Sequence, residues 1–304
     1  MFASLALLAA AQLGGVVIPL QKPPRQIEHP VAPLADAGPV FAGTCKDWDD
    51  WDKPAPPVRI HANTYLVGTC GISSILIAGE RGHVLIDGGS EAGADLIAAN
   101  IRKLGFRLAD VKYILESHEH NDHIGGVARL QRLTGAQVVA SPAAAKVLST
   151  GVANPDDPQA GMQKPLPVAQ VDRVIEDGGT VGLFDIQLTA VATPGHTAGA
   201  LTWRWESCYI GICRSMVYAD SLTPVSRDDY RFSDHPQYLA AFRTSIAKVA
   251  ALPCDILLTP HPSASGMVKR LGRAKVEDEN ACRDYAAALT KQLDERLAKE
   301  AAAK

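Results

Sequence analysis

The first half of the chain alternates short apolar runs with segments of helical spacing. Runs rich in β-branched and aliphatic residues, each bounded by Gly or Asn, predict a meander of strands over residues 64–68, 73–79 and 83–89. Apolar residues then recur at helical spacing up to Gly105, which predicts a helix over residues 91–105. The next segments predict a strand, a helix and a strand over residues 111–117, 125–135 and 136–141.

The second half repeats this order. Residues 151–170 are polar and rich in Pro and Gly, which predicts a long mobile loop. Strand-rich segments follow at 173–193, 200–207 and 214–221, and then a helix, a strand and an amphipathic helix at 234–253, 254–261 and 281–304. The same order of strands followed by helices thus occurs twice along the chain. This order predicts an α/β fold in which two mixed β-sheets pack face to face with helices outside.

The N-terminal residues differ from the rest. An apolar run from Phe2 to Leu13 is too short to span a bilayer and suits the core of a signal peptide. We therefore expect a signal peptide over residues 1–20, with an ordinary buried or frayed segment as the alternative. Residues 19–57 are rich in proline and lack periodicity. The prediction is one domain over residues 21–304 that begins with an extended N-terminal arm.

Composition narrows the class of partner. The chain has 304 residues, of which 47 % are hydrophobic and 21 % charged, and its formal net charge is −3. These values are typical of a globular protein with a large core. No basic block is present in the sequence, so nucleic acid is not an expected partner.

The six cysteines are scattered along the chain, at positions 45, 70, 208, 213, 254 and 282, and none forms a CxxC pair. Because zinc-binding cysteines usually occur in close pairs, an even and scattered set in an exported chain favours disulfides. Six cysteines allow 15 pairings. Proximity along the chain suggests Cys45–Cys70, Cys208–Cys213 and Cys254–Cys282. Six reduced and buried thiols remain the alternative if the protein is cytosolic.

Metal-competent side chains gather in the segment ESHEHNDHIGG, residues 116–126. His118 and His120 are one residue apart in an extended loop, so their side chains point the same way and can bind one ion. Asp122 and His123 follow a bend and can face a second ion. Two other histidines end strand-like runs and can complete three ligands on each ion, namely His196 for the first and His261 for the second. Three ligands with an open position are typical of a catalytic metal.

A histidine in a loop is usually an ordinary surface side chain, and HxH alone is common. HxHxDH is much harder to explain in that way, because such a cluster is costly without a cation. His196 and His261 taken singly would favour the ordinary interpretation, but both follow a strand-like run and precede a Gly or Pro turn. The remaining histidines lack such a setting and are interpreted as ordinary: His29, His61, His83 and His235.

The motifs SHEHNDHIGG, IDGG, TPGHTAGA and TPHPS, in this order, resemble the metallo-β-lactamase superfamily over residues 63–265. The resemblance implies an αββα sandwich with two Zn²⁺ ions at one edge of the sheets. It assigns the first zinc to His118, His120 and His196, and the second to Asp122, His123 and His261. Asp87 corresponds to an aspartate that orients the site from behind the ligands, although a turn-capping Asp is an alternative.

Finer features resemble the subclass B3 metallo-β-lactamases that have three disulfides. NTYLVGTCGISSILI and YADSLTPVS carry this likeness, and the six cysteine positions agree with it. The resemblance implies that Ser221 and Thr223 hold the substrate carboxylate, and that Gln159 lies near the site. It implies zinc-dependent hydrolysis of penicillins, cephalosporins and carbapenems by a metal-bound hydroxide, which Asp122 orients. A periplasmic or secreted monomer without a stable membrane anchor, which confers antibiotic resistance, would follow.

Two other functions stay open at this point. Thioester and lactone hydrolases of the same superfamily use an aspartate that bridges both metals, and Asp220 in YADS could take that position. A non-enzymatic zinc-binding protein on the same scaffold is the other, but such a scaffold could lose ligands freely, whereas all six are present. A nuclease is disfavoured, because no basic face or added nucleic-acid-binding domain is evident.

Overall fold

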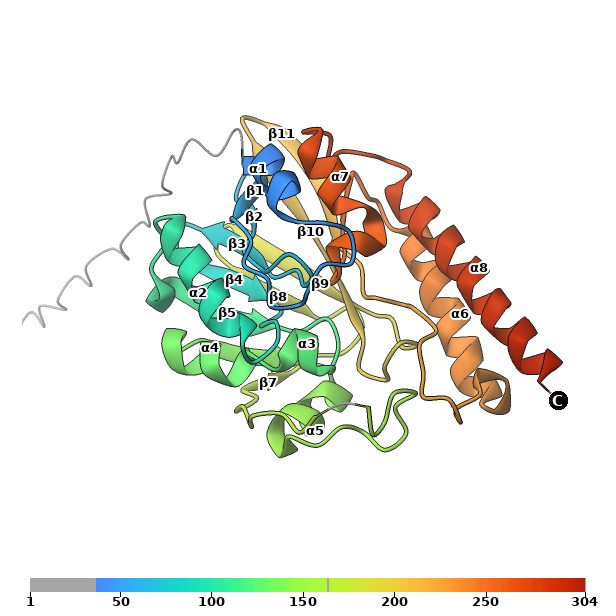
Figure 1. The fold of residues 1–304 in the computed structure, drawn as a ribbon. Coiled ribbons are helices and arrows are strands. Elements are labelled where there is room, and N and C mark those ends of the chain that lie inside the picture. The colour runs from blue at the N-terminus through green and yellow to red at the C-terminus, as the bar shows by residue number, and fades with distance from the viewer. Residues whose placement is uncertain (1–36, 163, 304) are drawn as a thin grey trace, which may run out of the picture.

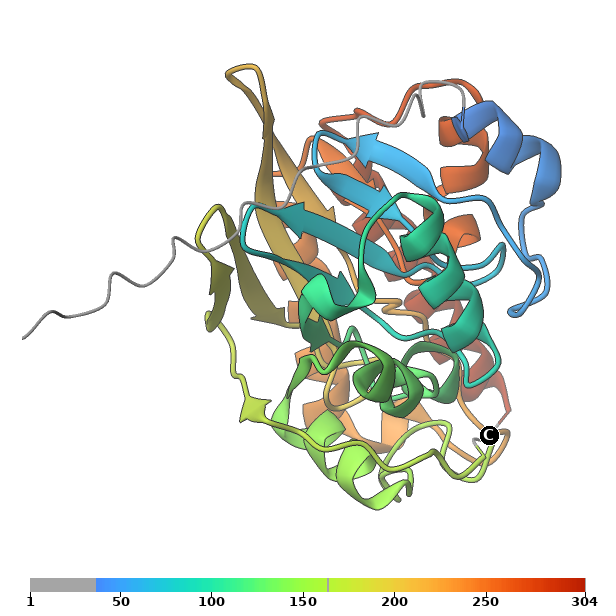
Figure 2. The ribbon, with the colours of Figure 1, turned by 90° about the vertical axis from the view of Figure 1, so that its left-hand side faces the viewer.

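The computed structural model describes residues 37–162 and 164–303 of the chain. Two β-sheets lie against each other and helices cover the outer face of each (Figure 1), an arrangement that the view in Figure 2 shows from the side. The predicted αββα sandwich is therefore confirmed. The predicted signal peptide lies outside the described residues.

The larger sheet has seven strands in sequence order. Its strands are β1 (Val58–His61), β2 (Thr64–Leu66), β3 (Ile75–Gly79), β4 (Gly82–Ile86), β5 (Val111–Leu115), β6 (Gln137–Ala140) and β7 (Arg173–Val174). The first four form an antiparallel meander, and the pairs from β4 to β7 are parallel. Every residue of β3 and β4 is buried, because both faces of the sheet are covered.

The smaller sheet has five strands in the order β12-β11-β10-β9-β8. They are β8 (Thr180–Leu183), β9 (Ile186–Ala192), β10 (Leu201–Tyr209), β11 (Ile212–Tyr218) and β12 (Ile256–Leu258). All pairs are antiparallel except β11 with β12. The inner faces of the two sheets share one apolar core, to which Ile77 and Ile86 contribute from the larger sheet and Trp203 and Met216 from the smaller.

Two further cores lie between the sheets and the outer helices. The larger sheet is covered by α2 (Gly93–Lys103), α4 (Val127–Thr134) and α5 (Pro142–Thr150). The smaller sheet is covered by α6 (Pro236–Ala251) and α8 (Ala281–Ala302), which lie side by side (Figure 1). Short helical segments complete the fold: η1 (Leu108–Asp110), α3 (Asn121–Ile124), η2 (Phe232–Asp234), η3 (Pro262–Ser265) and α7 (Met267–Gly272).

Local sequence explains where the helices begin and end. Ser141 caps α5, since its hydroxyl accepts a hydrogen bond from the Ala144 N–H at 3.2 Å, and Pro142 occupies the first turn. Both α4 and α5 stop at a glycine with a left-handed backbone, Gly135 and Gly151 at φ 72°. The described residues between Gly151 and β7 form turns without a helix or strand, which agrees with the predicted loop.

The prediction of an extended N-terminal arm is wrong for the residues from 37 to 44. These form α1 (Ala37–Thr44), which packs against α7. Phe41 is fully buried in the core between the sheets, and burial of a Phe side chain stabilises a fold by about 1.5–3 kcal/mol. The proline-rich composition concealed this single anchoring residue.

All six cysteines are in disulfides, in the pairs that proximity suggested. Cys208 and Cys213 face each other across β10 and β11, beside the turn at Ile210 and Gly211. The other two bridges join Cys45 to Cys70 and Cys254 to Cys282. Each closes a much longer loop, with sequence separations of 25 and 28 residues.

Reduction of the disulfides should lower the free energy of unfolding, because each bridge restricts the unfolded chain. A bridge typically contributes about 2–4 kcal/mol, and longer loops contribute more. Urea unfolding of the oxidised and reduced protein would measure the difference. A variant with Cys254→Ser and Cys282→Ser should lose less on reduction than the natural chain, whereas equal unfolding of oxidised and reduced protein would contradict the prediction.

Candidate metal centre

The predicted ligands meet where loops leave both sheets. Strand ends position them, because the backbone there is fixed while the side chains stay accessible to a ligand. The larger sheet supplies the segment after β5, with His118 and His120 in its loop and Asp122 and His123 in α3. The smaller sheet supplies His196 after β9 and His261 after β12.

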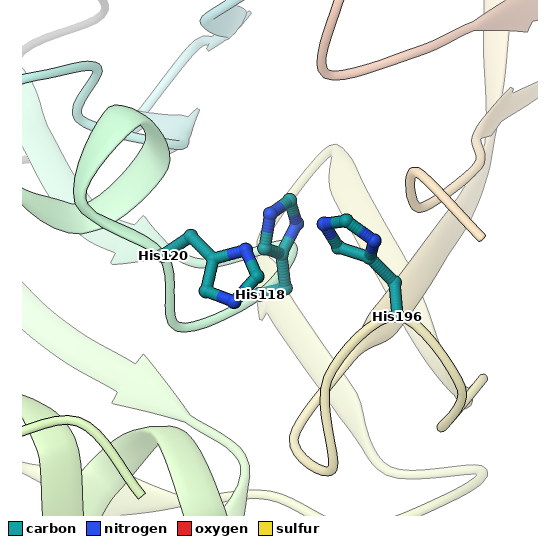
Figure 3. Close-up of side chains that lie close together, drawn as sticks. All are labelled: His118, His120 and His196. Atoms are coloured by element: carbon teal, nitrogen blue, oxygen red, sulfur yellow. The ribbon is translucent and has the colours of Figure 1, made fainter. Parts of the chain in front are cut away.

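Three histidines form the first group. Ligand atoms of His118, His120 and His196 all lie within 4.8 Å of one another, and the three side chains are buried. Figure 3 shows the rings of His118 and His120 on one loop and the ring of His196 facing them from another. Their ring centroids are 4.8–5.0 Å apart. More than seventy residues separate these two loops in sequence, and the packing of the two sheets brings them together.

One nitrogen of each of these rings lies close to an oxygen atom of a neighbouring residue. Nδ1 of His118 lies 2.8 Å from a carboxylate oxygen of Asp220, and Nε2 of His120 lies 3.1 Å from Asp157. Nδ1 of His196 lies 2.9 Å from the carbonyl oxygen of Thr223. The contacts of His120 and His196 are hydrogen bonds, and a metal-binding histidine usually donates its second N–H in this way, which fixes the ring and its tautomer. The Asp220 oxygen beside His118 has no hydrogen-bond partner among the described residues.

A second group combines a carboxylate and two histidines. Nε2 of His123 lies 3.0 Å from Oδ2 of Asp122 and 3.4 Å from Nε2 of His261, while Nε2 of His261 lies 3.2 Å from the same Asp122 oxygen. Three ligand atoms thus form a small triangle. Nδ1 of His261 lies 3.3 Å from the carbonyl oxygen of Gly71, so this ring is also held from behind.

Asp87 lies beside the loop of His118 and the ring of His123, and its orienting role stays a prediction. Its carboxylate is fully buried and accepts hydrogen bonds of 2.7 Å from the backbone N–H and the hydroxyl of Ser117 and from the Tyr218 hydroxyl. Nδ1 of His123 lies 3.5 Å from the same carboxylate. Asp87 therefore connects the loop that carries His118 to the ring of His123.

Replacement of Asp87 by alanine should strongly destabilise the protein. Three buried donors would lose their acceptor, and each unsatisfied group costs about 1–3 kcal/mol. We expect a loss of several kcal/mol in urea unfolding and a weaker second metal site. Tyr218→Phe removes a single donor and is the matched control, for which we expect a loss of at most about 1.5 kcal/mol. An Asp87→Ala protein as stable as this control would contradict the assignment.

Burial and neighbouring charges shift the pKa values of the candidate ligands in different directions. Burial, together with the charges of His118 and His120, lowers the pKa of His196 to about 3. Burial also opposes a charge on His123, but the carboxylates of Asp122 and Asp87 raise its pKa to about 10. Burial favours the neutral form of Asp122, yet His123 and His261 hold the pKa of this carboxyl well below its usual range.

These side chains fit a divalent metal. Nε2 of His118 is buried and has no hydrogen-bond partner among the described residues, which is rare for a polar atom in a protein interior. Imidazole nitrogen and carboxylate oxygen are the ligands that zinc and similar ions prefer. The structure thus brings all six predicted ligands together in two groups of three, and their roles as ligands stay predictions.

Asp220, which could bridge two metals in the alternative hypothesis, lies beside the ring of His118. Its fully buried carboxylate contacts Nδ1 of His118. Among the described residues, two sets of three ligand atoms lie within 4.8 Å of one another, those of His118, His120 and His196 and those of His118, Asp122 and His123, and Asp220 belongs to neither set. This position suits a residue that orients His118.

The predicted substrate-binding residues border the first group. The Ser221 hydroxyl is buried and has no hydrogen-bond partner within the described chain. The Thr223 hydroxyl lies 3.1 Å from Nδ1 of His196, so Thr223 also holds a ligand ring. Nε2 of Gln159 lies 3.5 Å from Nε2 of His196, which places this loop residue at the site as the resemblance implied.

Three residues at the site were not predicted from the sequence. Asp157 in the loop after α5 is buried against His120, and the sequence offered only its place in the loop near Gln159 as a signal. The rings of Trp48 and Trp51 lie 6.4 Å and 6.3 Å from the ring of His261. Both tryptophans are exposed, so aromatic surface lies beside His261.

Comparison with known families agrees with this geometry. A model described as the metallo-beta-lactamase superfamily matches residues 67–261. Among solved structures, the MIM-2 metallo-beta-lactamase is 53 % identical, with a TM-score of 0.84, and the match covers 87 % of this chain and 98 % of that one. MEM-A1, a subclass B3 metallo-beta-lactamase from a soil metagenome library, is 46 % identical, with a TM-score of 0.81 over 84 % of this chain and 100 % of that one.

Curated relatives are more distant. A hydroxyacylglutathione hydrolase of Rhodopseudomonas palustris (strain BisB5) is 28 % identical over 165 residues, which are 54 % of this chain and 52 % of that protein. The chain spans about half the length of this relative and between 26 % and 60 % of the length of the other first matches. Sequence similarity to this chain therefore extends to proteins whose names differ from those of the β-lactamases.

Proposed function

The chain belongs to the metallo-beta-lactamase superfamily, and from this premise we propose that it is a two-zinc enzyme that hydrolyses the amide bond of β-lactams. It is a hydrolase with metal-binding side chains at a site of the family type. Penicillins, cephalosporins and carbapenems are the proposed substrates, and antibiotic resistance is the proposed consequence.

One observation carries the choice of substrate. The likeness to β-lactamases reaches 53 % identity over 87 % of the chain, whereas the hydroxyacylglutathione hydrolases match 26–60 % of their own length at 28–33 % identity.

Different residues of the chain would bind the metal, orient the water and bind the substrate. Bound zinc ions would lower the pKa of a coordinated water and polarise the lactam carbonyl. Asp122 supplies a carboxylate between His123 and His261, where it can orient the attacking water as well as bind metal. The Ser221 hydroxyl, which has no hydrogen-bond partner among the described residues, is a suitable donor to the substrate carboxylate, and the Thr223 hydroxyl lies beside the ring of His196.

The proposed location is the periplasm or the exterior of the cell. Three disulfides support it, because such bonds persist in oxidising compartments. The described part of the chain has no helix that is long and apolar enough to cross a membrane. We propose a single domain that acts as a monomer on a small-molecule substrate, without nucleic acid.

A hydroxyacylglutathione thioester hydrolase is the second candidate, because curated relatives of that name match the chain. The test is to give the zinc-loaded protein a carbapenem, a cephalosporin and a glutathione thioester in parallel, and to follow each by absorbance. Rapid opening of the lactam rings with slow thioester cleavage is the expected result. Thioester cleavage without lactam turnover would reject the proposed function in favour of the second candidate.

A further inference from the structure

The two loops that carry the first metal group are joined by a series of hydrogen bonds across the two sheets. The Trp203 side chain donates to the carbonyl oxygen of Glu116 at 2.7 Å, and the Leu201 N–H donates to that of Ser117 at 2.7 Å. Both donors belong to β10, in the smaller sheet. The acceptors lie at the end of β5 in the larger sheet, directly before His118.

Glu119 ends this series. It stands between His118 and His120, so in an extended loop its side chain points to the opposite side from theirs. Its carboxylate accepts hydrogen bonds from the Thr197 hydroxyl at 2.6 Å and from the Gly199 N–H at 2.9 Å. Thr197 follows His196 directly, so Glu119 links the loop of the third ligand to the loop of the first two.

This link is enclosed and closely fitted. Glu119 is 3 % exposed and Thr197 is fully buried, and a buried carboxylate is costly unless it is paired or hydrogen-bonded. Only a glycine fits at position 199 in this arrangement, since a Cβ there would lie 2.7 Å from the carboxylate and 2.6 Å from the Ser141 hydroxyl. The Ser245 hydroxyl of α6 donates to the Pro194 carbonyl oxygen at 2.7 Å and anchors the same loop on its other side.

From this arrangement we infer that Glu119 is a positioning residue: through Thr197 and Gly199 it sets the distance of His196 from His118 and His120, and thereby the affinity of the first metal. The inference rests on the proposed metal site and goes beyond the residues that would touch the ion. Partners of metal ligands typically change metal affinity about 10–100-fold when they are removed.

The test compares Thr197→Val, which removes the donor but keeps the shape, with Thr197→Ser, which keeps the donor. The full-length protein is loaded with zinc, and release of each ion to a chromophoric chelator is measured. Thr197→Val and Glu119→Ala should release the first ion about 10–100-fold more readily, with the second ion little affected. Thr197→Ser should behave like the natural chain.

Thr64→Val is the matched control, because the Thr64 hydroxyl accepts a hydrogen bond from the Trp205 side chain across the same two sheets, away from the site. It should lower the melting temperature without changing zinc release. Cobalt(II) in place of zinc adds a second readout, since its visible absorption spectrum should change in Thr197→Val and not in Thr64→Val.

Unchanged release of the first ion from both Thr197→Val and Glu119→Ala would overturn the inference. Equal weakening of both ions, or an effect of Thr64→Val as large as that of Thr197→Val, would reduce Glu119 to a general stabilising role and would overturn it as well. None of these measurements uses a β-lactam, so their outcome is independent of whether the protein turns over that substrate.

Discussion

Removal of the metal should lower carbapenem hydrolysis by at least about 10³-fold. A metal that activates water and polarises a carbonyl contributes several kcal/mol to transition-state stabilisation, and each 1.36 kcal/mol corresponds to a factor of ten in rate. The chain offers no cysteine nucleophile to take over, because all six cysteines are in disulfides. The measurement is the initial rate of ring opening before and after dialysis against a chelator.

Restoration supplies the control for this result. Zinc added back after removal of the chelator should restore the rate, whereas magnesium should not, because it prefers oxygen ligands and the first group has only histidine nitrogens. A metal-depleted protein that keeps its full rate would reject the metal-dependent mechanism. Loss of the rate without recovery would point to irreversible unfolding, which circular dichroism would reveal.

His196→Ala should have the second largest effect. It removes one of three nitrogens from the first group and leaves a cavity next to Gln159 and Thr223. We expect about one zinc ion per chain in place of two, and a fall of about 10²–10³-fold in kcat/KM, equivalent to about 2.7–4 kcal/mol. Metal analysis and steady-state kinetics on the same preparation would measure both.

His61→Ala serves as the comparison, since His61 lies on β1 and contacts Ser207, apart from both groups. Its zinc content and rate should match those of the natural chain. If His196→Ala bound two zinc ions and kept most of its activity, the ligand assignment would be wrong.

Most of the fold prediction rested on patterns among residues that are close in sequence. The β-rich runs and helical spacings located the strands and helices because each depends on residues close in sequence, and Gly135 ends α4 as expected for a left-handed cap. The prediction failed at α1, where a single buried Phe41 determines the structure within a proline-rich segment. The amino-acid composition of a segment does not reveal that one of its residues is buried in the core.

The candidate ligands could be predicted because the HxHxDH segment gathers side chains whose clustering is energetically unfavourable without a cation. Their supporting residues could not, since Asp157 and Glu119 gain their meaning from partners 37 and 78 residues away in sequence. An acidic residue in a polar loop has no distinguishing pattern until the fold brings a histidine or a threonine against it. The resemblance to a family supplied Asp87, but it did not supply these two.

Each group of three ligands draws on both sheets, and this has a thermodynamic consequence. The proposed zinc ions would bind the docked sheets and not the separated ones, so metal binding and global unfolding would be linked equilibria. An excess of free zinc at one hundred times Kd would add about 2.7 kcal/mol to the free energy of unfolding for each independent ion. The melting temperature, measured at increasing concentrations of free zinc, would therefore report zinc binding without any substrate.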